Sequence, residues 1–271
     1  MILSIITINW NNAQGLERTI RSVVSQNYKD FEYLIIDGGS TDGSVDIIKK
    51  YASSFHINWV SEPDKGIYNA MNKGILKASG EYLHFLNSGD MLYDDNVVAQ
   101  MVEMIEKYKH PAMLTGYMYL QMPDGSLKKK AIGDNYSFIR FYTTSINHPA
   151  TYIKRELFDK FGLYDESLKI VSDWKWFTQV VAFNRKFPRI VHVNVSIFDL
   201  TGISTVNEQL RLDERKAVLK DIVPQCFLSD YEHYTKDIFL MARIRQHKWA
   251  FNLVKCIDKL VSLIEKRKKR K

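Results

Sequence analysis

Two polar segments in the first third of the chain carry the residues best suited to chemistry. Residues 61–74 read Ser-Glu-Pro-Asp-Lys-Gly-Ile-Tyr-Asn-Ala-Met-Asn-Lys-Gly, and residues 87–90 read Asn-Ser-Gly-Asp directly after an apolar run. Carboxylates and amides in the first segment can accept hydrogen bonds from a base and a ribose. A carboxylate at a strand end, as in the second segment, is a ligand that Mg²⁺ or Mn²⁺ prefers. Together the segments predict a site for a nucleotide sugar and a divalent cation.

Polar residues of this kind recur where four predicted strands end. The predicted strands are apolar runs at residues 3–8, 31–36, 57–60 and 82–86, separated by stretches with helical spacing. This alternation predicts an α/β fold with a mostly parallel central sheet flanked by helices. Ligands bind beyond the carboxyl ends of such strands, so the polar groups at these ends should converge on one crevice. Taken singly, each group is typical of an ordinary turn.

The second half of the chain alternates less regularly. Its pattern predicts a helix over 97–108, a strand over 113–120, a hairpin turn at 123–126, an irregular loop over 133–150, helices over 157–162 and 174–184, and a strand over 190–200. From residue 207 onward the pattern is helical, with a break at Pro224. We therefore expect one domain over residues 1–205 and a basic, amphipathic helical extension over residues 206–271.

The charge of the chain is concentrated at its end. Residues 236–271 hold twelve Lys and Arg against three Asp and Glu, a net charge of +9, whereas the whole chain has +7. Residues 1–235 therefore have a net charge of −2. A near-neutral body argues against a protein that binds nucleic acid across its main domain. The cationic end favours an anionic surface as its partner.

Cysteine usage and hydropathy bear on the compartment. Cys226 and Cys256 match no zinc spacing and no disulfide framework, which favours a reducing compartment such as the cytoplasm. Residues 1–8 lack a basic leader and a cleavage site, so we expect a strand there and no signal peptide. No window of 18 uninterrupted apolar residues predicts a membrane-spanning helix.

Several of these segments resemble family-2 glycosyltransferases of the GT-A fold. Residues 4–9 (Ser-Ile-Ile-Thr-Ile-Asn) and 35–43 (Ile-Ile-Asp-Gly-Gly-Ser-Thr-Asp-Gly) are similar to the nucleotide-binding half of that family. Residues 64–74 resemble the branch that builds bacterial surface polysaccharides, and residues 87–90 resemble its metal-binding Asp-x-Asp region. The resemblance covers about residues 1–205. It implies a Rossmann-like GT-A domain that transfers a sugar with inversion.

The resemblance also implies roles for individual residues on the sugar-donor side. Thr7 and Asn9 would edge the base pocket, and Asp37 would accept a hydrogen bond from uracil as an acceptor-only group. Asp64 would lie against the nucleoside. Lys65, or else Asn72, would face the diphosphate, although Lys65 can equally be a solvated turn residue. The implied set for the sugar donor is Thr7, Asn9, Asp37, Gly38, Asp64, Lys65, Asn72, Asn87 and Ser88.

The metal region departs from the family pattern, because Asp-x-Asp-Asp is common there and this chain keeps only the last acid. One protein carboxylate suffices for Mg²⁺ or Mn²⁺ when diphosphate oxygens and water complete the coordination sphere. We therefore expect Asp90 to be the metal ligand, with Asn87 as a second, direct or water-bridged oxygen. The alternative is that Asp90 only caps the end of its strand.

Residues 171–176 (Val-Ser-Asp-Trp-Lys-Trp) resemble the segment that carries the general base in the family. Asp173 would take the proton of the acceptor hydroxyl, although an Asp here also suits a helix N-cap. Trp174 and Trp176 cannot share one helical face, so one of them, here taken as Trp174, would offer a platform to a sugar ring. His148 resembles an acceptor contact.

The chain end combines an apolar helical face with lysines. Trp249, Leu253 and Ile257 recur at helical spacing, and six consecutive basic residues close the chain. This pattern is typical of an interfacial helix on an anionic membrane. The alternatives are packing on the protein's own domain or on a second subunit of a homodimer.

The sequence thus predicts a metal-dependent, inverting glycosyltransferase at the cytoplasmic face of the inner membrane. The sugar donor would be a nucleoside-diphosphate sugar, with UDP expected, and the acceptor a hydroxyl of a glycan or of a lipid-linked saccharide. Two other classes remain open. One is a non-catalytic sugar-binding or scaffold protein of the same fold. The other is a nucleotidyltransferase, which should carry basic residues in the loop at 10–15, where this chain has none.

Overall fold

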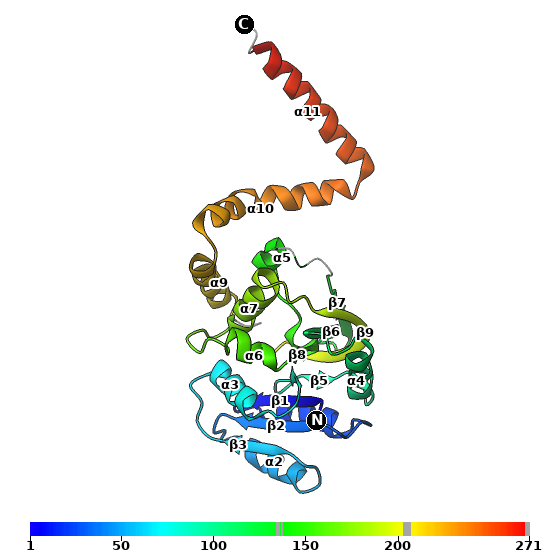
Figure 1. Ribbon diagram of the computed structural model, residues 1–271, viewed down its shortest axis with the longest axis vertical. Helices are drawn as coiled ribbons and strands as arrows, with labels where there is room; N and C mark the ends of the chain where they lie inside the picture. The colour runs from blue at the N-terminus through cyan, green and yellow to red at the C-terminus, as the bar shows by residue number, and fades with distance from the viewer. Residues whose placement is uncertain (134–135, 137, 203–206, 269–271) are drawn as a thin grey trace. The chain divides into compact units, whose positions relative to one another are not determined.

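The computed structural model describes residues 1–133, 136, 138–202 and 207–268 (Figure 1). The chain divides into two compact units, Met1–Lys216 and Ala217–Lys271. The first unit holds the sheet and every residue predicted for the site. The expected boundary near residue 205 stays a prediction.

Four parallel strands form one half of the sheet. In the order β3 (Asn58–Ser61), β2 (Glu32–Asp37), β1 (Leu3–Asn9) and β4 (Tyr82–Phe85), each strand pairs with its neighbour in parallel. The register sets Asn9 beside Asp37 and Asp37 beside Ser61. The carboxyl ends of these strands therefore lie together, as the alternating pattern predicted.

The other half of the sheet mixes strand directions. Its strands are β5 (Met91–Leu92), β6 (Met113–Gln121), β7 (Leu127–Lys130), β8 (Thr151–Lys154) and β9 (Arg189–Asp199). β8 is antiparallel to both β4 and β6, β9 runs parallel to β6, and β5 is antiparallel to β9. β6 and β7 form the predicted hairpin, whose turn uses Gly125 at a φ of +82°.

Helices cover both faces of the sheet, and alternation along the strands divides the core in two. Ile5 on β1 packs with α1 (Ala13–Val24), α2 (Ser44–Ala52) and α4 (Val97–Lys107). Ile6, the next residue, packs with α3 (Ile67–Lys77), α6 (Glu156–Phe161) and α7 (Ser172–Phe177) on the opposite face. Gly74 lets α3 approach closely, because a Cβ there would lie 2.6 Å from Ile6. These findings confirm the predicted α/β fold with flanking helices.

The region predicted as an irregular loop contains regular structure. α5 (Phe138–Thr143) and a 3₁₀ turn, η1 (His148–Ala150), lie within residues 133–150, so the loop prediction is wrong there. The predicted helix over 174–184 begins two residues earlier, as α7, and continues as a π-helix, η2 (Thr178–Phe183). α5 escaped notice because, unlike the equally short α6, which Gly162 follows directly, it has no glycine to mark its end.

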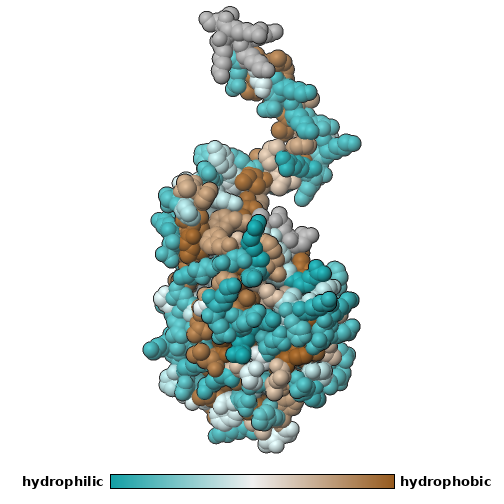
Figure 2. Space-filling view, in the orientation of Figure 1, coloured by the Kyte–Doolittle hydropathy of each residue, from teal (hydrophilic) through white to brown (hydrophobic). Residues whose placement is uncertain are grey.

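The C-terminal helices follow the predicted pattern. α9 (Glu208–Ile222) is followed by α10 (Gln225–Arg245), with Pro224 at the N-cap of α10, and by α11 (Lys248–Lys268). Figure 2 shows hydrophobic side chains among hydrophilic ones along these helices. Within the described ranges, none of the helices is both long enough and apolar enough to span a bilayer.

Candidate active site

Asp37 is the centre of a hydrogen-bonded cluster at the ends of β1, β2 and β3. Its Oδ1 accepts from Asn9 Nδ2 at 2.7 Å and Ser40 Oγ at 2.6 Å, and its Oδ2 accepts from Ser40 N at 2.9 Å and Ser61 Oγ at 2.6 Å. Burial opposes ionisation of this carboxyl, but the bonds from Ser40, Ser61 and Asn9 outweigh it and lower the pKa of Asp37. The cluster therefore presents a fixed negative charge at the sheet edge.

Asn9 contributes a second acceptor to this cluster. Its Oδ1 is buried and meets no hydrogen-bond partner in the part of the chain that is described. Thr7, two residues earlier on β1, is fully buried, and its hydroxyl bonds to Tyr33 and to the carbonyl oxygen of Leu86. Thr7 thus ties strands together beneath the cluster, whereas Asn9 lies within it.

Gly38 allows Asp64 to approach the end of β2. A Cβ at Gly38 would lie 3.0 Å from Asp64 Oδ2 and 3.3 Å from the ring of Trp10. Asp64 is held by Lys73, whose Nζ lies 2.6 Å from Asp64 Oδ1 and 2.9 Å from Glu62 Oε1. Trp10 is 71% exposed, so an open aromatic face stands beside this carboxylate. The sequence-based expectation missed Trp10, whose only signal is its place directly after Asn9.

Lys65 and Asn72 lie at different depths. Lys65 is exposed, and its backbone N–H donates to Asn69 Oδ1 at 3.2 Å. Asn72 is buried, and both the nitrogen and the oxygen of its side-chain amide form hydrogen bonds within the protein. It donates to the carbonyl of Tyr164 and to Glu166, and it accepts from the Tyr164 N–H. Of the two, only Lys65 has a side chain open to a ligand.

The turn after β4 brings residues 87–90 against α1 and the end of β9. Ser88 accepts hydrogen bonds from Asn12 Nδ2 at its carbonyl and its hydroxyl. Asn87 Oδ1 is buried and has no partner among the residues that the structure describes. Asp90 is 4% exposed, and its Oδ1 accepts from the Asp199 N–H at 2.9 Å. Burial raises the pKa of Asp90 to about 8.

The side chains around this turn offer a divalent cation only a few protein ligands. The described ranges contain no group of three or more His, Cys, Asp and Glu that could hold a metal ion. The oxygens near this turn that could bind a cation are the carboxyl of Asp90, the buried Oδ1 of Asn87, which has no hydrogen-bond partner among the described residues, and the carboxylate of Asp199. Asp199 also forms an ion pair with Arg18 at 2.8 Å. All are hard oxygens of the kind that Mg²⁺ and Mn²⁺ prefer. The chemistry fits a cation that takes most of its ligands from a diphosphate and water.

Asp173 stands in the first turn of α7 with one side open. Its side chain is 23% exposed. The Tyr68 hydroxyl donates to Asp173 Oδ1 at 2.9 Å, and His148 Nδ1 lies 3.9 Å from Oδ2. Tyr68 belongs to α3, the helix that directly follows Asp64 and Lys65. This contact joins the predicted base to the segment predicted to bind the sugar donor.

His148 is 7% exposed and lies among aromatic rings. Phe85 and Phe177 are 5.0 and 5.6 Å from its ring centre, and Tyr164 Oη lies 3.1 Å from its Nε2. Burial lowers the pKa of His148, with the charge of Asp173 acting in the opposite direction. His148 is therefore a neutral neighbour of Asp173 near pH 7.

Both tryptophans of α7 pack into the core. Trp174 is 1% exposed and donates its Nε1–H to the carbonyl of Phe141, and Trp176 donates to the carbonyl of Gly162. The guanidinium of Arg215 lies 4.7 Å from the Trp174 ring centre. Trp174 thus lies beneath the surface around Asp173 and presents no open ring face.

Helix α9 holds the segment that leads into α7, which the sequence had not indicated. Glu214 accepts from the backbone N–H groups of residues 169, 170 and 171 at 2.7, 2.9 and 3.3 Å. Arg215 donates to the carbonyl oxygens of Thr143 and Thr144. Burial lowers the pKa of Arg215 to about 10, which leaves it charged at pH 7. A cation and a fixed backbone therefore flank Asp173.

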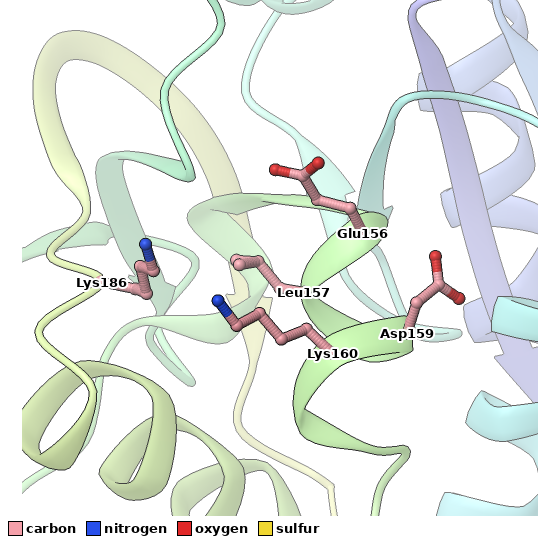
Figure 3. A pocket seen from close by; sticks show the side chains of 5 residues that line it. All are labelled: Glu156, Leu157, Asp159, Lys160 and Lys186. Carbon is pink, nitrogen blue, oxygen red and sulfur yellow. The ribbon is translucent and has the colours of Figure 1, made fainter.

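An open hollow of about 430 Å³ lies elsewhere, on α6 (Figure 3). It is lined by Glu156, Leu157, Asp159, Lys160 and Lys186. None of these belongs to the clusters described above, and the lining mixes two carboxylates with two lysines and one apolar side chain. We therefore do not assign the hollow to the active site.

Comparison with known sequences gives one family match and two similar proteins. The family described as "Glycosyl transferase family 2" matches residues 4–167. An uncharacterized glycosyltransferase of Mycobacterium tuberculosis is 32% identical over 209 residues, which cover 76% of this chain and 78% of the relative. A PGL/p-HBAD biosynthesis glycosyltransferase of Mycobacterium bovis is 28% identical over 203 residues, with 74% and 78% covered.

Solved structures share the fold at low identity. Staphylococcus aureus TarS 1–349, in complex with UDP-GlcNAc, has a TM-score of 0.60 and 18% identity, with 73% of this chain and 58% of that chain covered. The mannosyltransferase PcManGT of Pyrobaculum calidifontis, in complex with GDP-Man and Mn²⁺, has a TM-score of 0.54 and 18% identity, with 79% and 60% covered. This chain thus spans less than two thirds of each of these two solved proteins.

Proposed function

Because the chain belongs to glycosyl transferase family 2 and has the GT-A fold of its solved neighbours, we propose that it is an inverting transferase that uses a nucleoside-diphosphate sugar. The nucleotide is expected to be UDP, as in the TarS complex. The acceptor would be a hydroxyl of a glycan or of a lipid-linked saccharide in polysaccharide biosynthesis. The observation that carries the proposal is the contact between Tyr68, on the helix after the sugar-donor motif, and Asp173, the candidate base.

The proposed chemistry is a single displacement. The acceptor oxygen forms a bond to the anomeric carbon while the bond from that carbon to the diphosphate oxygen breaks. The nucleoside diphosphate leaves with the bonding electron pair, and Asp173 takes the proton of the acceptor hydroxyl. One carboxylate on the acceptor side suffices for this route.

On the sugar-donor side, the nucleobase would bind at the cluster at the sheet edge. Uracil in a nucleotide has one N–H, and Asp37, which already accepts four hydrogen bonds, would take it in exchange for one of its serine hydroxyls. The free oxygen of Asn9 would lie beside this contact, with Thr7 holding the strands below. Gly38 leaves room for Asp64 beside the nucleoside, and the nucleobase would stack on the exposed ring of Trp10. Lys65 would meet the diphosphate, and Ser88 and Asn87 would border it. Asn72 would act from below by holding the segment near Tyr164.

We further propose that the reaction depends on Mn²⁺ or Mg²⁺, with Asp90 as the protein carboxylate and Asn87 beside it. The cation would supply positive charge to the departing diphosphate. Two features support this: the buried Oδ1 of Asn87 has no hydrogen-bond partner among the described residues, and the side chains at this turn present oxygen ligands of the kind that these cations prefer. The mannosyltransferase structure contains Mn²⁺ on the same fold.

The acceptor would reach Asp173 from its open side, next to His148, with Trp174 supporting that surface from the core. The C-terminal helices would bring the enzyme to a lipid-linked acceptor at the cytoplasmic face of the membrane. Trp249 is 73% exposed, and Leu253, Ile257 and Leu260 on the same helix are also exposed. An aromatic-bearing apolar face beside many lysines is the composition that interfacial helices use.

One observation keeps a non-catalytic, sugar-binding role as a second candidate. The region after β4 has a single acid, and that acid is buried and favours its neutral form in the absence of a cation. A protein that binds a nucleotide sugar without cleaving it could tolerate this. Turnover decides between the two.

The test is a panel of UDP-sugars and GDP-mannose with and without Mn²⁺, with release of the nucleoside diphosphate as the signal. The wild-type chain should turn over at least one sugar donor, and Asp173→Asn should lower that rate by about 100-fold or more. Asp159→Asn, an exposed acid on α6, serves as the matched control and should leave the rate unchanged. Turnover that survives in Asp173→Asn would remove the proposed base. Nucleotide-dependent thermal shifts without turnover would support the non-catalytic candidate.

A further inference from the structure

We propose that Tyr68 positions the base, and that its hydroxyl holds Oδ1 of Asp173 so that Oδ2 is the oxygen that takes the acceptor proton. The inference rests on the proposed function, since it assumes that Asp173 is the base. It goes beyond that function by assigning a role to a tyrosine outside the reacting groups and by distinguishing the two oxygens of one carboxylate.

The Tyr68 hydroxyl contacts two groups on the segment that leads into α7. It lies 2.9 Å from Asp173 Oδ1 and 2.6 Å from the carbonyl oxygen of Ile170, so its single proton has two acceptors, of which the charged carboxylate is the stronger. The hydroxyl therefore lies between the backbone at Ile170 and the side chain of Asp173, three residues later. A carboxylate fixed at one oxygen has lost most of its freedom to rotate, so the second oxygen is presented in one direction.

Oδ2 is the oxygen that stays available. Among the residues that the structure describes, no group donates a hydrogen bond to it. Its neighbour is His148, whose Nδ1 lies at 3.9 Å, beyond hydrogen-bonding distance. His148 is held by the Tyr164 hydroxyl at its other nitrogen, 3.1 Å away. A hydroxyl that approaches from the open side therefore meets Oδ2 as an acceptor without a competing donor.

Tyr68 is suited to this task by its surroundings. It is buried, and its ring packs 5.7 Å from that of Tyr164. Burial first, and then the charge and the hydrogen bond of Asp173, raise the pKa of Tyr68 well above its ordinary value. Tyr68 therefore keeps its proton and remains a hydrogen-bond donor throughout the range in which such an enzyme works.

The charged and titratable groups around Asp173 determine how pH can report on this contact. Among the described residues, those whose charge or proton interacts with Asp173 are Tyr68 on α3, Lys130 on β7, His148 on η1, Tyr164 before α7 and Arg215 on α9. Both tyrosines hold their protons and His148 stays neutral near pH 7. A change in the acid limb of the pH–rate profile on substitution of Tyr68 would then report on the contact between Tyr68 and Asp173.

The test is Tyr68→Phe in the full chain, with the sugar donor found in the panel. Loss of the hydroxyl removes a hydrogen bond that favours the ionised carboxylate, so the acid limb should move to higher pH, by about one pH unit. The turnover number should fall by about 10- to 100-fold because the carboxylate is no longer held in one orientation. The KM for the sugar donor should change less than about twofold, since Tyr68 does not contact the sugar-donor cluster.

Tyr152→Phe is the matched control. Tyr152 is another fully buried tyrosine, on β8, and its hydroxyl has no hydrogen-bond partner within the described ranges. The same chemical change there should leave both the turnover number and the acid limb where they are. An equal effect of the two variants would overturn the positioning role, because it would mean that any buried tyrosine hydroxyl matters.

Two further variants, Asp173→Asn and a ring-fluorinated tyrosine at position 68, distinguish the possible outcomes. An unchanged acid limb and turnover number in Tyr68→Phe, with Asp173→Asn inactive, would reject the role of Tyr68 and leave the proposed function standing. Full activity of Asp173→Asn would reject the base itself. Should Tyr68→Phe fail to fold, a ring-fluorinated tyrosine at position 68 keeps the hydroxyl as a stronger donor, and the acid limb should then move to lower pH. No movement, or movement to higher pH, would overturn the proposal.

Discussion

The backbone N–H of Asp199 donates to Oδ1 of Asp90 across a distance of 2.9 Å, which joins the end of β9 to the turn after β4. The two residues are far apart in the sequence. A Cβ at Gly89 would lie 2.9 Å from Asp199 Oδ2, so the turn accepts this neighbour only because residue 89 is a glycine, at a φ of +106°. Two carboxyl groups thus share one small region of the site.

Removal of the metal should expose the role of Asp90. We expect turnover to be lost with EDTA and restored by Mn²⁺, because the metal ion would supply most of the positive charge that balances the departing diphosphate. Asp90→Asn removes the carboxylate ligand and should raise the Mn²⁺ concentration for half-maximal activity by about tenfold or more. Asp30→Asn, an exposed acid on the same unit, should leave the Mn²⁺ titration unchanged. A normal titration in Asp90→Asn would show that Asp90 caps its strand and binds no metal.

The Asp165–Lys175 ion pair should make stability depend on pH. Lys175 Nζ lies 2.7 Å from Asp165 Oδ2, and this bond, with that from Ser167, lowers the pKa of Asp165 to about 2. A lowered pKa means that the stabilisation is present above about pH 4 and is lost as the pH falls toward 2. With its partial exposure discounted, Asp165→Asn should reduce the free energy of unfolding by about 1 kcal/mol at pH 7 and by almost nothing at pH 2. Denaturant titrations at the two pH values measure this, and equal losses at both would contradict it.

Glu214 should support the base through the backbone. Glu214→Gln replaces one acceptor oxygen by an amino group that faces N–H groups of residues 169–171, so we expect a loss of about 1–3 kcal/mol in unfolding free energy. The turnover number should fall as well, because this segment leads into Asp173. Glu208→Gln is the control on the same helix, since Glu208 is exposed and pairs with Arg211 at 3.1 Å. Urea denaturation and initial rates report the two effects, and equal behaviour of both variants would refute the role of Glu214.

The C-terminal helix should bind anionic membranes. Chains that end at residue 247 lack α11 and the terminal lysines and arginines, each worth about 1 kcal/mol near an anionic leaflet. We expect the full chain to co-sediment with vesicles that contain phosphatidylglycerol and to be released by high salt, whereas the shortened chain should stay in solution. Leu260→Ser tests the apolar face separately and should weaken binding without removing the charge. Binding that survives truncation, or dimerisation through α11 without lipid binding, would contradict this prediction.

The parallel half of the fold could be predicted because each of its signals is local. Apolar runs that end in polar turns are readable within a few residues, and so is the Gly125 hairpin in the other half of the sheet. The contact between Asp90 and Asp199 could not be foreseen in this way. It depends on the antiparallel pairing of β5 with β9, a contact between distant segments that no local pattern specifies.

Trp174 and Tyr68 show why side-chain roles were harder to foresee than positions. The spacing of Trp174 and Trp176 predicts that they point in different directions, and they do contact different residues. Both rings are nevertheless buried in the core: Trp174 donates a hydrogen bond to the carbonyl of Phe141, and Trp176 stacks on Phe158 at 4.5 Å. Tyr68 looks in the sequence like any aromatic residue of a buried helix face. Only the fold reveals that its hydroxyl ends at Asp173.

Helix α3 contacts both the proposed nucleotide side of the site and the segment that carries Asp173. Lys73 on this helix holds Asp64, while Tyr68, Asn69 and Asn72 grip the stretch from Tyr164 to Asp173. A shift of this one helix would carry the proposed nucleotide side and the proposed proton acceptor together, so the spacing between them would change little when the surrounding loops move. Changes in exposed loops could then alter which acceptor binds without altering the distance between the proposed nucleotide-sugar site and Asp173.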